Sequence, residues 1–96
     1  MNLENNEIEA NIEQIASILA GMSDKRRVSG FFNDMFTKAE RADIAMRWAL
    51  VKELGEKTPQ RVIAGKLGLS LCKITRGSRE LKKPDSTFAA MLAAIK

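Results

Sequence analysis

Apolar residues recur every three or four positions along almost the whole chain, and this spacing limits the possible folds more than any other feature of the sequence. The first example is the set Ile8, Ile12, Ile15 and Leu19. Residues at these intervals share one face of an α-helix, whereas a strand needs apolar and polar residues to alternate. No stretch of the sequence alternates for long enough to form a strand. We therefore predict an all-α chain.

Capping residues and helix breakers divide this pattern into six predicted helices. Gly21 ends the first helix, and Ser23 can cap the second. Thr37 and Glu40 have the spacing of a capping box, in which each side chain accepts a backbone N–H near the start of a helix. The third helix therefore begins there, and Gly55 closes it.

The second half of the chain contains three shorter predicted helices. The dipeptide Thr58-Pro59 opens the fourth, with the threonine as its cap and the proline at its first position. Gly68 ends this helix, and Ser70 caps a short fifth helix that stops near Gly77. The last predicted helix begins at Pro84.

The composition excludes several classes of site. The 96 residues include one cysteine and no histidine. The chain therefore lacks an internal disulfide, Cys/His zinc ligands and the catalytic arrangements that need histidine. We expect no metal and no enzymatic activity. A chain of this length also buries only a small core, which suggests that a second copy or partner supplies part of it.

No segment has the pattern of a targeting signal or a membrane span. The N-terminal residues are acidic, and the longest apolar runs are a few residues, far below the ~20 that cross a bilayer. A lone cysteine, Cys72, fits a reducing compartment better than secretion. We therefore expect a cytoplasmic protein with no membrane partner.

Charge is distributed unevenly along the chain. The first 24 residues carry five acids and no base, whereas the segment from Gln60 to Lys83 carries seven bases and one acid. A compact basic segment is typical of nucleic-acid binding. A solvated basic face is the alternative that charge alone leaves open.

The basic segment contains the spacing of a helix-turn-helix. In QRVIAGKLGLSLCKI, the small Ala64 lets two helices cross closely, and Gly68 accepts the left-handed turn between them. Ile74 anchors the second helix on the first, and Leu67 and Leu69 fill the angle between the helices. This set indicates a DNA-reading motif, although an ordinary helical hairpin has some of the same features.

The second helix of this motif is expected to enter the major groove by its N-terminal end. Because Ile74 faces inward, its neighbours are left to face bases or phosphates, and basic residues around the motif can contact phosphates. For Lys66 and Lys83 a solvated charge is an equally good interpretation. The predicted DNA contacts are Gln60, Arg61, Ser70, Leu71, Cys72, Lys73, Thr75, Arg76 and Lys82.

Arg47 lies on the apolar stripe of the third predicted helix. A guanidinium there needs an anion or a stacked planar group, because an unpaired buried charge is very costly. A ligand is one interpretation. The alternatives are snorkelling to solvent or an internal ion pair with Asp43, Glu53 or Glu80.

The run KITRGSRELKK, from Lys73 to Lys83, resembles the ITRGSN-x-LK signature of the tryptophan repressor family. The similarity extends back through QRVIAGKLGLS to FTKAERADIAMRW and covers about Phe31 to Lys96. The resemblance implies an interlocked homodimer of six-helix chains. It also implies that free L-tryptophan binds between the core and each DNA-reading head as co-repressor, and that the dimer binds a palindromic operator in double-stranded DNA.

The resemblance also assigns ligand residues by position. The family's two arginines, which sandwich the indole and bind the ligand carboxylate, fall on Arg47 and Arg76. Glu80 stands where the family often has Ser or Ala, and it can either pair with the ligand ammonium or compete for the arginines. Positions for the family's core-helix threonine, ammonium-binding carbonyls and slot walls fall on Thr37, Asp34, Phe36, Leu50 and Gly77.

The expected organisation is one domain over residues 1–96, with four parts. These are an acidic N-terminal arm and helix (1–22), dimer-core helices (23–56), the helix-turn-helix head (58–77) and a C-terminal core helix (84–96). Three functions remain open at this stage. They are a tryptophan-dependent repressor, a related regulator with another aromatic effector or none, and a helical module whose basic face binds an acidic protein.

Overall fold

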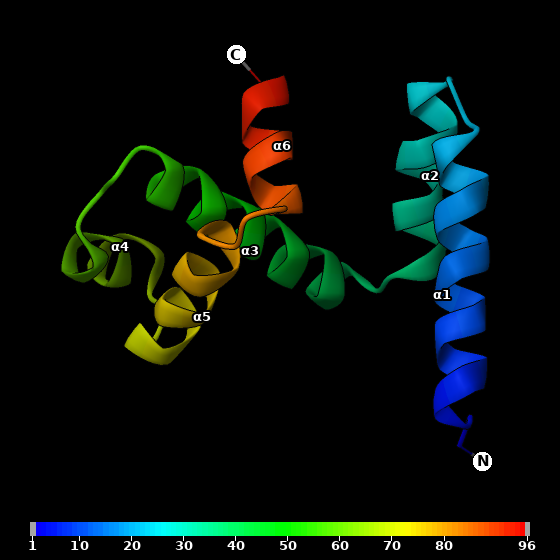
Figure 1. Cartoon of the computed structure of the whole chain (residues 1–96), viewed down its shortest axis with the longest axis horizontal. Coiled ribbons are helices and arrows are strands. Elements are labelled where there is room, and N and C mark those ends of the chain that lie inside the picture. Colours follow the sequence, from blue (N-terminus) through cyan, green and yellow to red (C-terminus); the bar gives the residue numbers. More distant parts are fainter. Residues whose placement is uncertain (1, 96) are drawn as a thin grey trace. The chain divides into compact units, whose positions relative to one another are not determined.

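A computed structural model describes residues 2–95, and six α-helices with no strand make up this described part (Figure 1). The prediction of an all-α, six-helix chain is confirmed. The chain forms two compact units, one ending at Lys38 and one beginning at Ala39. None of the described helices combines the length and the apolar composition that a bilayer span needs. The helices are α1 (Asn5–Ala20), α2 (Lys25–Met35), α3 (Lys38–Gly55), α4 (Gln60–Leu67), α5 (Leu71–Leu81) and α6 (Thr87–Ala94).

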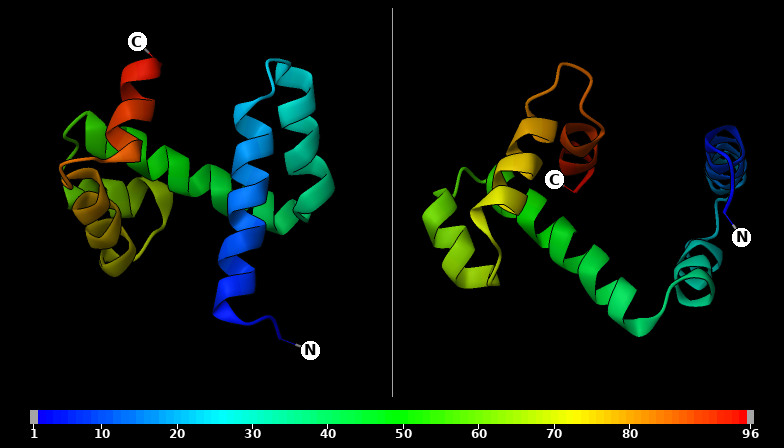
Figure 2. Two further views of the ribbon diagram at one scale, coloured as in Figure 1. Left: turned by 45° about the vertical axis from the view of Figure 1, so that its right-hand side comes forward. Right: turned by 90° about the horizontal axis from the view of Figure 1, so that it is seen from below.

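The first unit is a hairpin of α1 and α2, which run antiparallel side by side (Figure 2). The first helix ends at Gly21, as predicted. The predicted cap of the second helix was wrong by one residue. Asp24, not Ser23, is the N-cap, and its carboxylate accepts the Arg26 N–H at 2.9 Å. A carboxylate serves well there because its charge also interacts favourably with the helix dipole.

Aromatic rings and exposed aliphatic residues make up the apolar surface of this hairpin. Phe31 packs edge-on against Phe32 and Phe36, with ring centroids 5.4 and 6.0 Å away. Neither α1 nor α2 contains a buried residue, so the hairpin has no closed core of its own. Its exposed large apolar residues are Leu3, Ile8, Ile12, Ile18, Met22, Phe32 and Met35.

The second unit has a closed core. Leu50 of α3, Ile63 of α4 and Ile74 of α5 form its buried cluster, and the two isoleucines are fully inaccessible. The predicted inward position of Ile74 is confirmed. The predicted packing residues Ala64, Leu67 and Leu69 contact the cluster, together with Leu54.

The turn between α4 and α5 has the predicted helix-turn-helix geometry. Gly68 ends α4 with φ at +66°, in the left-handed region that a Cβ disfavours. Its N–H donates to the Ala64 carbonyl at 2.9 Å. Ser70 caps α5 by accepting the Lys73 N–H at 3.3 Å. Both residues therefore do what the local pattern predicted.

The fifth helix is longer than predicted, because Gly77 does not end it. The helix continues to Leu81. A Cβ on Gly77 would lie 3.2 Å from a Leu50 methyl carbon and 3.3 Å from a Leu54 methyl carbon. The glycine therefore serves the close approach of α5 to α3, and it does not act as a stop signal.

Two predicted helix starts were also wrong. The last helix begins at Thr87, and the Ser86 hydroxyl caps it by accepting the Ala89 N–H at 3.1 Å. Pro84 therefore lies before the helix and not at its first position. The Ser86 side chain can accept a backbone N–H of the first turn, whereas a proline side chain has no acceptor atom. The fourth helix begins at Gln60, with Pro59 at the N-cap position.

After α3 the chain turns toward α4, and one residue of this turn has a left-handed backbone conformation. The helix ends at Gly55 as predicted, but the residue with positive φ is Lys57, at +62°. The Lys57 N–H donates to the Leu54 carbonyl and the Thr58 N–H to the Glu53 carbonyl, each at 3.0 Å. This is the hydrogen-bond pattern of a Schellman motif, which usually places glycine at the left-handed position.

Candidate ligand cavity and DNA-reading surface

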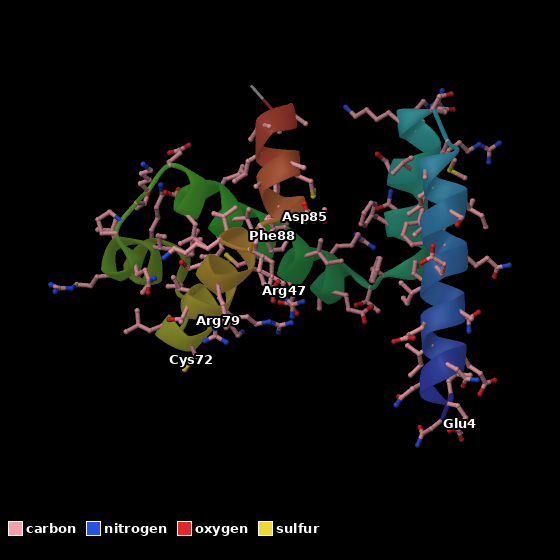
Figure 3. All side chains as sticks on the ribbon, viewed as in Figure 1. Glu4, Arg47, Cys72, Arg79, Asp85 and Phe88 are labelled. Atoms are coloured by element: carbon pink, nitrogen blue, oxygen red, sulfur yellow. The ribbon has the colours of Figure 1, made fainter. Side chains whose placement is uncertain are left out.

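A cavity of about 230 Å³ lies within the second unit. Its walls come from α3, the helix-turn-helix, and the beginning of α6, and Figure 3 labels Arg47 on α3 and Phe88 on α6 near α5. Four of its residues were predicted as ligand residues from family positions on α3 and α5, and a fifth, Glu80, from its departure from them. The lining residues are Arg47, Leu50, Val51, Leu69, Lys73, Arg76, Gly77, Glu80 and Phe88.

The cavity combines an apolar surface with charged residues. Leu50, Val51, Leu69 and Phe88 supply aliphatic and aromatic contacts, which suit a planar aromatic ligand. Basic side chains at the same cavity suit a carboxylate, because a guanidinium can donate two parallel hydrogen bonds to it. Small-molecule sites are usually apolar cavities with a small number of polar groups that fix the orientation of the ligand.

Helical spacing explains why α5 presents charged groups to the cavity. Lys73, Arg76, Gly77 and Glu80 follow one another at intervals of three, one and three residues, which places them on one face. Gly77 has no side chain, so α5 lies close to Leu50 at this level. Charged side chains therefore lie on either side of the point where Gly77 lets α5 lie close to Leu50.

Arg47 and Arg76 meet at this cavity, which spacing along the chain could not establish. Both side chains are exposed, so neither carries the cost of an unpaired buried charge. The described residues include no ion pair of Arg47, and two of its predicted partners are engaged elsewhere. Glu53 pairs with Lys66, and Glu80 pairs with Lys83.

Glu80 brings a negative charge to the cavity. Its carboxylate lies 2.9 Å from Lys83 Nζ, and this hydrogen bond lowers the pKa of Glu80 below its ordinary value. The nearby charges of Lys83, Arg76 and Arg79 act in the same direction. The carboxylate is therefore ionised at neutral pH, and Lys83 is a partner of Glu80 more than a free phosphate contact.

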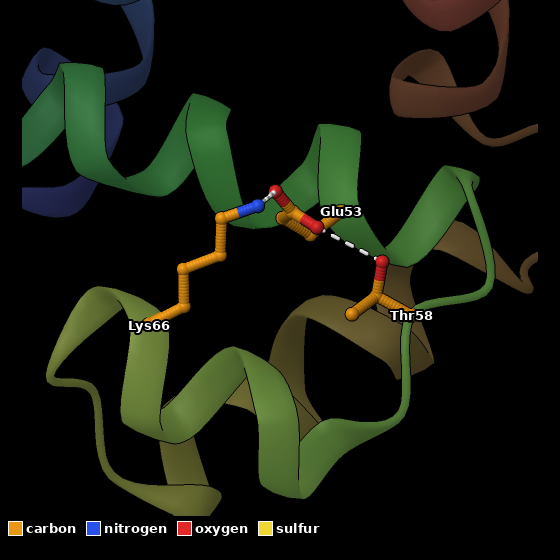
Figure 4. Close-up of polar contacts among 3 residues, drawn as sticks. All are labelled: Glu53, Thr58 and Lys66. Atoms are coloured by element: carbon orange, nitrogen blue, oxygen red, sulfur yellow. Dashed lines mark hydrogen bonds and ion pairs between the residues drawn. The ribbon is translucent and has the colours of Figure 1, made fainter.

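A second ion pair connects α3 to the head (Figure 4). Lys66 Nζ lies 2.6 Å from one oxygen of Glu53, and the Thr58 hydroxyl donates to the other oxygen at 2.9 Å. These contacts lower the pKa of Glu53, with the Lys66 hydrogen bond the largest cause, and raise the pKa of Lys66. Thr58 therefore bonds a side chain of α3, and the prediction that it caps α4 was wrong.

The predicted DNA contacts are exposed along α4, the turn and α5. Figure 3 shows Cys72 at the N-terminal end of α5 with its side chain directed outward. Two of these residues, Lys73 and Arg76, also line the cavity. The exposed set is Gln60, Arg61, Ser70, Leu71, Cys72, Lys73, Thr75, Arg76 and Lys82.

Three predicted ligand residues, Asp34, Phe36 and Thr37, belong to the first unit, whereas every lining residue of the cavity comes from the second. Sequence reasoning missed four lining residues. Leu69 was assigned only to packing, Lys73 only to DNA, and Val51 and Phe88 only to apolar helix faces. A helical projection of α5 from Arg76 would have identified Lys73. Among residues 2–95 no cluster of acidic or cysteine side chains could hold a metal ion.

The family model described as "Trp repressor protein" matches residues 10–96. The chain belongs to the Trp repressor family. Members of this family are transcription regulators, which are not a class of enzyme. The resemblance to the tryptophan repressor family is therefore confirmed.

Several curated relatives carry the name Trp operon repressor homolog. Proteins of Chlamydia trachomatis serovars L2 and D are each 34% identical over 89 residues, which cover 91% of this chain and 94% of the relative. A protein of Chlamydia caviae is 43% identical over 63 residues, or 65% of this chain and 62% of that relative. No solved structure gives a significant match.

Proposed function

We propose that this transcriptional repressor binds a palindromic operator as a homodimer and uses L-tryptophan as co-repressor. The observation that carries the proposal is the cavity between α3 and the DNA-reading helix, where Arg47 and Arg76 flank an apolar surface. A ligand held there contacts both the core helix and the reading helix. If it binds the DNA-competent arrangement of α5 more tightly, it shifts the population toward that arrangement.

The roles of the individual residues follow from their chemistry. The guanidinium of Arg76 binds the ligand carboxylate, and Arg47 stacks on the indole plane from α3. Leu50 and Gly77 form the walls of the slot, and Glu80 pairs with the ligand ammonium. For Asp34, Phe36 and Thr37, a ligand role through backbone carbonyls and a hydroxyl is proposed from the family resemblance alone.

Calorimetry with L-tryptophan tests the ligand directly, and it avoids the fluorescence of Trp48. We expect saturable binding to the wild-type chain and no binding to Arg76→Ala. Arg79→Ala is the matched control, because Arg79 is an exposed arginine of α5 that does not line the cavity. An unchanged titration of Arg76→Ala would argue against this cavity as the site.

DNA binding is tested in a second experiment. Double-stranded fragments are selected from a random library with L-tryptophan present, and their affinities are then measured with and without it. We expect a palindromic selection, tighter binding with tryptophan, and a steep loss of affinity as salt rises, because phosphate contacts release counterions. Equal affinity with and without the amino acid would exclude the co-repressor role.

A homodimer is proposed because the described residues of the first unit include no buried one and several exposed large apolar ones. Removal of such an apolar surface from water is the main favourable term in most protein–protein association. Sedimentation of the full chain should give the dimer mass. Ile12→Asp should weaken the dimer, and Asn11→Asp, one position away, should leave it intact.

We also place the repressor in the cytoplasm, where bacterial DNA is found.

Glu80 favours a second candidate, a related repressor with another aromatic effector or none. Its carboxylate is a built-in anion beside Arg76, and it can occupy the positive charge that a ligand would otherwise bind. Calorimetry with L-tryptophan and with indole-3-propionate, which lacks the amine, separates the candidates. Preference for tryptophan that is lost in Glu80→Gln supports the amino acid, and absence of binding by either supports the alternative.

A further inference from the structure

Lys73 lies in the wall of the ligand cavity, although its place near the start of α5 indicates a DNA contact. It precedes Arg76 by three residues on the same helix face, so the two side chains are neighbours one turn apart. The Ser70 hydroxyl accepts the Lys73 N–H at 3.3 Å and fixes the backbone of this first turn. The backbone that carries the Lys73 ammonium is therefore held in place beside the cavity.

The charges around the cavity are unbalanced. Arg47, Lys73 and Arg76 bring three positive charges, and Glu80 brings the single negative charge. Glu80 is already paired with Lys83 at 2.9 Å. Within the described residues none of the three cations forms an ion pair. The cavity therefore has a net positive charge, to which Lys73 and Arg47 contribute as well as Arg76.

A ligand carboxylate has the capacity for two such partners. Each of its two oxygens accepts hydrogen bonds, and charge-assisted bonds to cations are the strong ones. Arg76 and Lys73 stand on the same wall, about 4.5 Å apart along the helix axis. That separation lets a guanidinium and an ammonium approach one carboxylate from two sides.

We propose that Lys73 is a ligand-binding residue, which together with Arg76 holds the carboxylate of the aromatic ligand. The inference rests on the proposed ligand role of the cavity and adds a specificity determinant to it. With two cations on one acidic group, the site selects carboxylate-bearing aromatic compounds, and their affinity depends on ionic strength.

The test is calorimetry of L-tryptophan at several salt concentrations with the wild type, Lys73→Gln, Lys73→Arg and Lys82→Gln. Lys82→Gln is the matched control, because Lys82 is an exposed lysine at the end of α5 that does not line the cavity. Lys73→Gln should bind about three- to tenfold more weakly than wild type. Its affinity should also fall less with salt, and Lys73→Arg should restore both properties.

The salt dependence separates ligand pairing from a structural role, since a merely less stable fold would not flatten it. Wild-type affinity and salt dependence in Lys73→Gln would overturn the proposal. If Lys73→Gln keeps wild-type ligand affinity but binds DNA more weakly, Lys73 contacts phosphate and not the ligand. Failure of the wild type to bind L-tryptophan would remove both this inference and the proposed function, whereas normal binding by all four proteins would remove this inference alone.

Discussion

Gly77 of α5 lies directly against Leu50 of α3, and a Cβ added to Gly77 would come within 3.2 Å of a Leu50 methyl carbon. Both residues line the cavity. The contact between α3 and α5 at this point is therefore also a wall of the proposed ligand site. Packing at this point and the space available to a ligand are controlled by the same two residues.

Gly77→Ala should weaken ligand binding without unfolding the protein. Alanine favours the helix over glycine by about 1 kcal/mol, and Leu50 can yield into the cavity by the few tenths of an ångström required. That displacement reduces the space for the ligand. Calorimetry with L-tryptophan and thermal unfolding measure the two effects.

Gly65→Ala is the control for this substitution, because nothing lies within 4 Å of a Cβ at that position of α4. It should raise the free energy of unfolding by about 0.5–1 kcal/mol and leave ligand affinity unchanged. Unaltered ligand affinity in Gly77→Ala would show that Leu50 does not bound the ligand site.

Lys57→Gly should stabilise the protein. Lys57 has φ at +62°, where a Cβ costs roughly 1 kcal/mol that glycine does not pay. We expect the free energy of unfolding to rise by about 0.5–1 kcal/mol in urea titrations, after the larger backbone entropy of unfolded glycine is included. Lys52→Gly, the same change inside α3, should lower it by about 1 kcal/mol. Equal effects of the two substitutions would contradict the left-handed assignment.

Glu53→Gln should remove a pH-dependent part of the stability. The pKa of Glu53 is lowered in the folded protein by its hydrogen bonds from Lys66 and Thr58. A lowered pKa means that the stabilisation is present above the ordinary value of 4.5 and is lost as the pH falls through the folded value. The wild type should therefore be more stable than the variant at pH 7, and the difference should vanish in strong acid.

Urea midpoints between pH 7 and pH 2 measure this difference. Lys66→Gln and Thr58→Val each remove one partner of the carboxylate, so each should reproduce part of the effect. A constant gap between wild type and Glu53→Gln across this range would mean that the contacts do not depend on ionisation.

Ile74→Ala should unfold or greatly loosen the head. Ile74 is fully buried between α4 and α3, and truncation of such a residue costs about 2–5 kcal/mol. Leu71→Ala, on the same helix at 57% exposure, should change stability by less than about 0.5 kcal/mol. Thermal unfolding followed by circular dichroism distinguishes them. Similar melting temperatures for both variants would contradict the observed orientation of α5.

Local chemistry explains which predictions succeeded. Ile74 was correctly placed inside because its spacing from other apolar residues is a property of one helix. Gly68 and Ser70 were correct because a left-handed turn and a helix cap involve neighbours only a few residues away. Such features need no knowledge of distant segments, so a single sequence contains them.

The errors arose where distant residues compete with local preferences. Glycine is a residue type that often ends helices, but Gly77 lets α5 lie close to Leu50, which precedes it by 27 residues. Threonine is a residue type that often caps helices, but the Thr58 hydroxyl donates to the Glu53 carboxylate. Sequence spacing within one helix carries no information about either partner.

The sequence by itself determined an all-α chain, a helix-turn-helix in a basic segment, and membership of a family of repressors, because periodicity, turn chemistry and a specific motif are local properties. Only the tertiary structure decided which charges face one another. It brought Arg47, Lys73, Arg76 and Glu80 to one cavity and paired Lys66 with Glu53. The physical reason is that long side chains find their partners through the crossing of helices, which depends on the packing of the whole core.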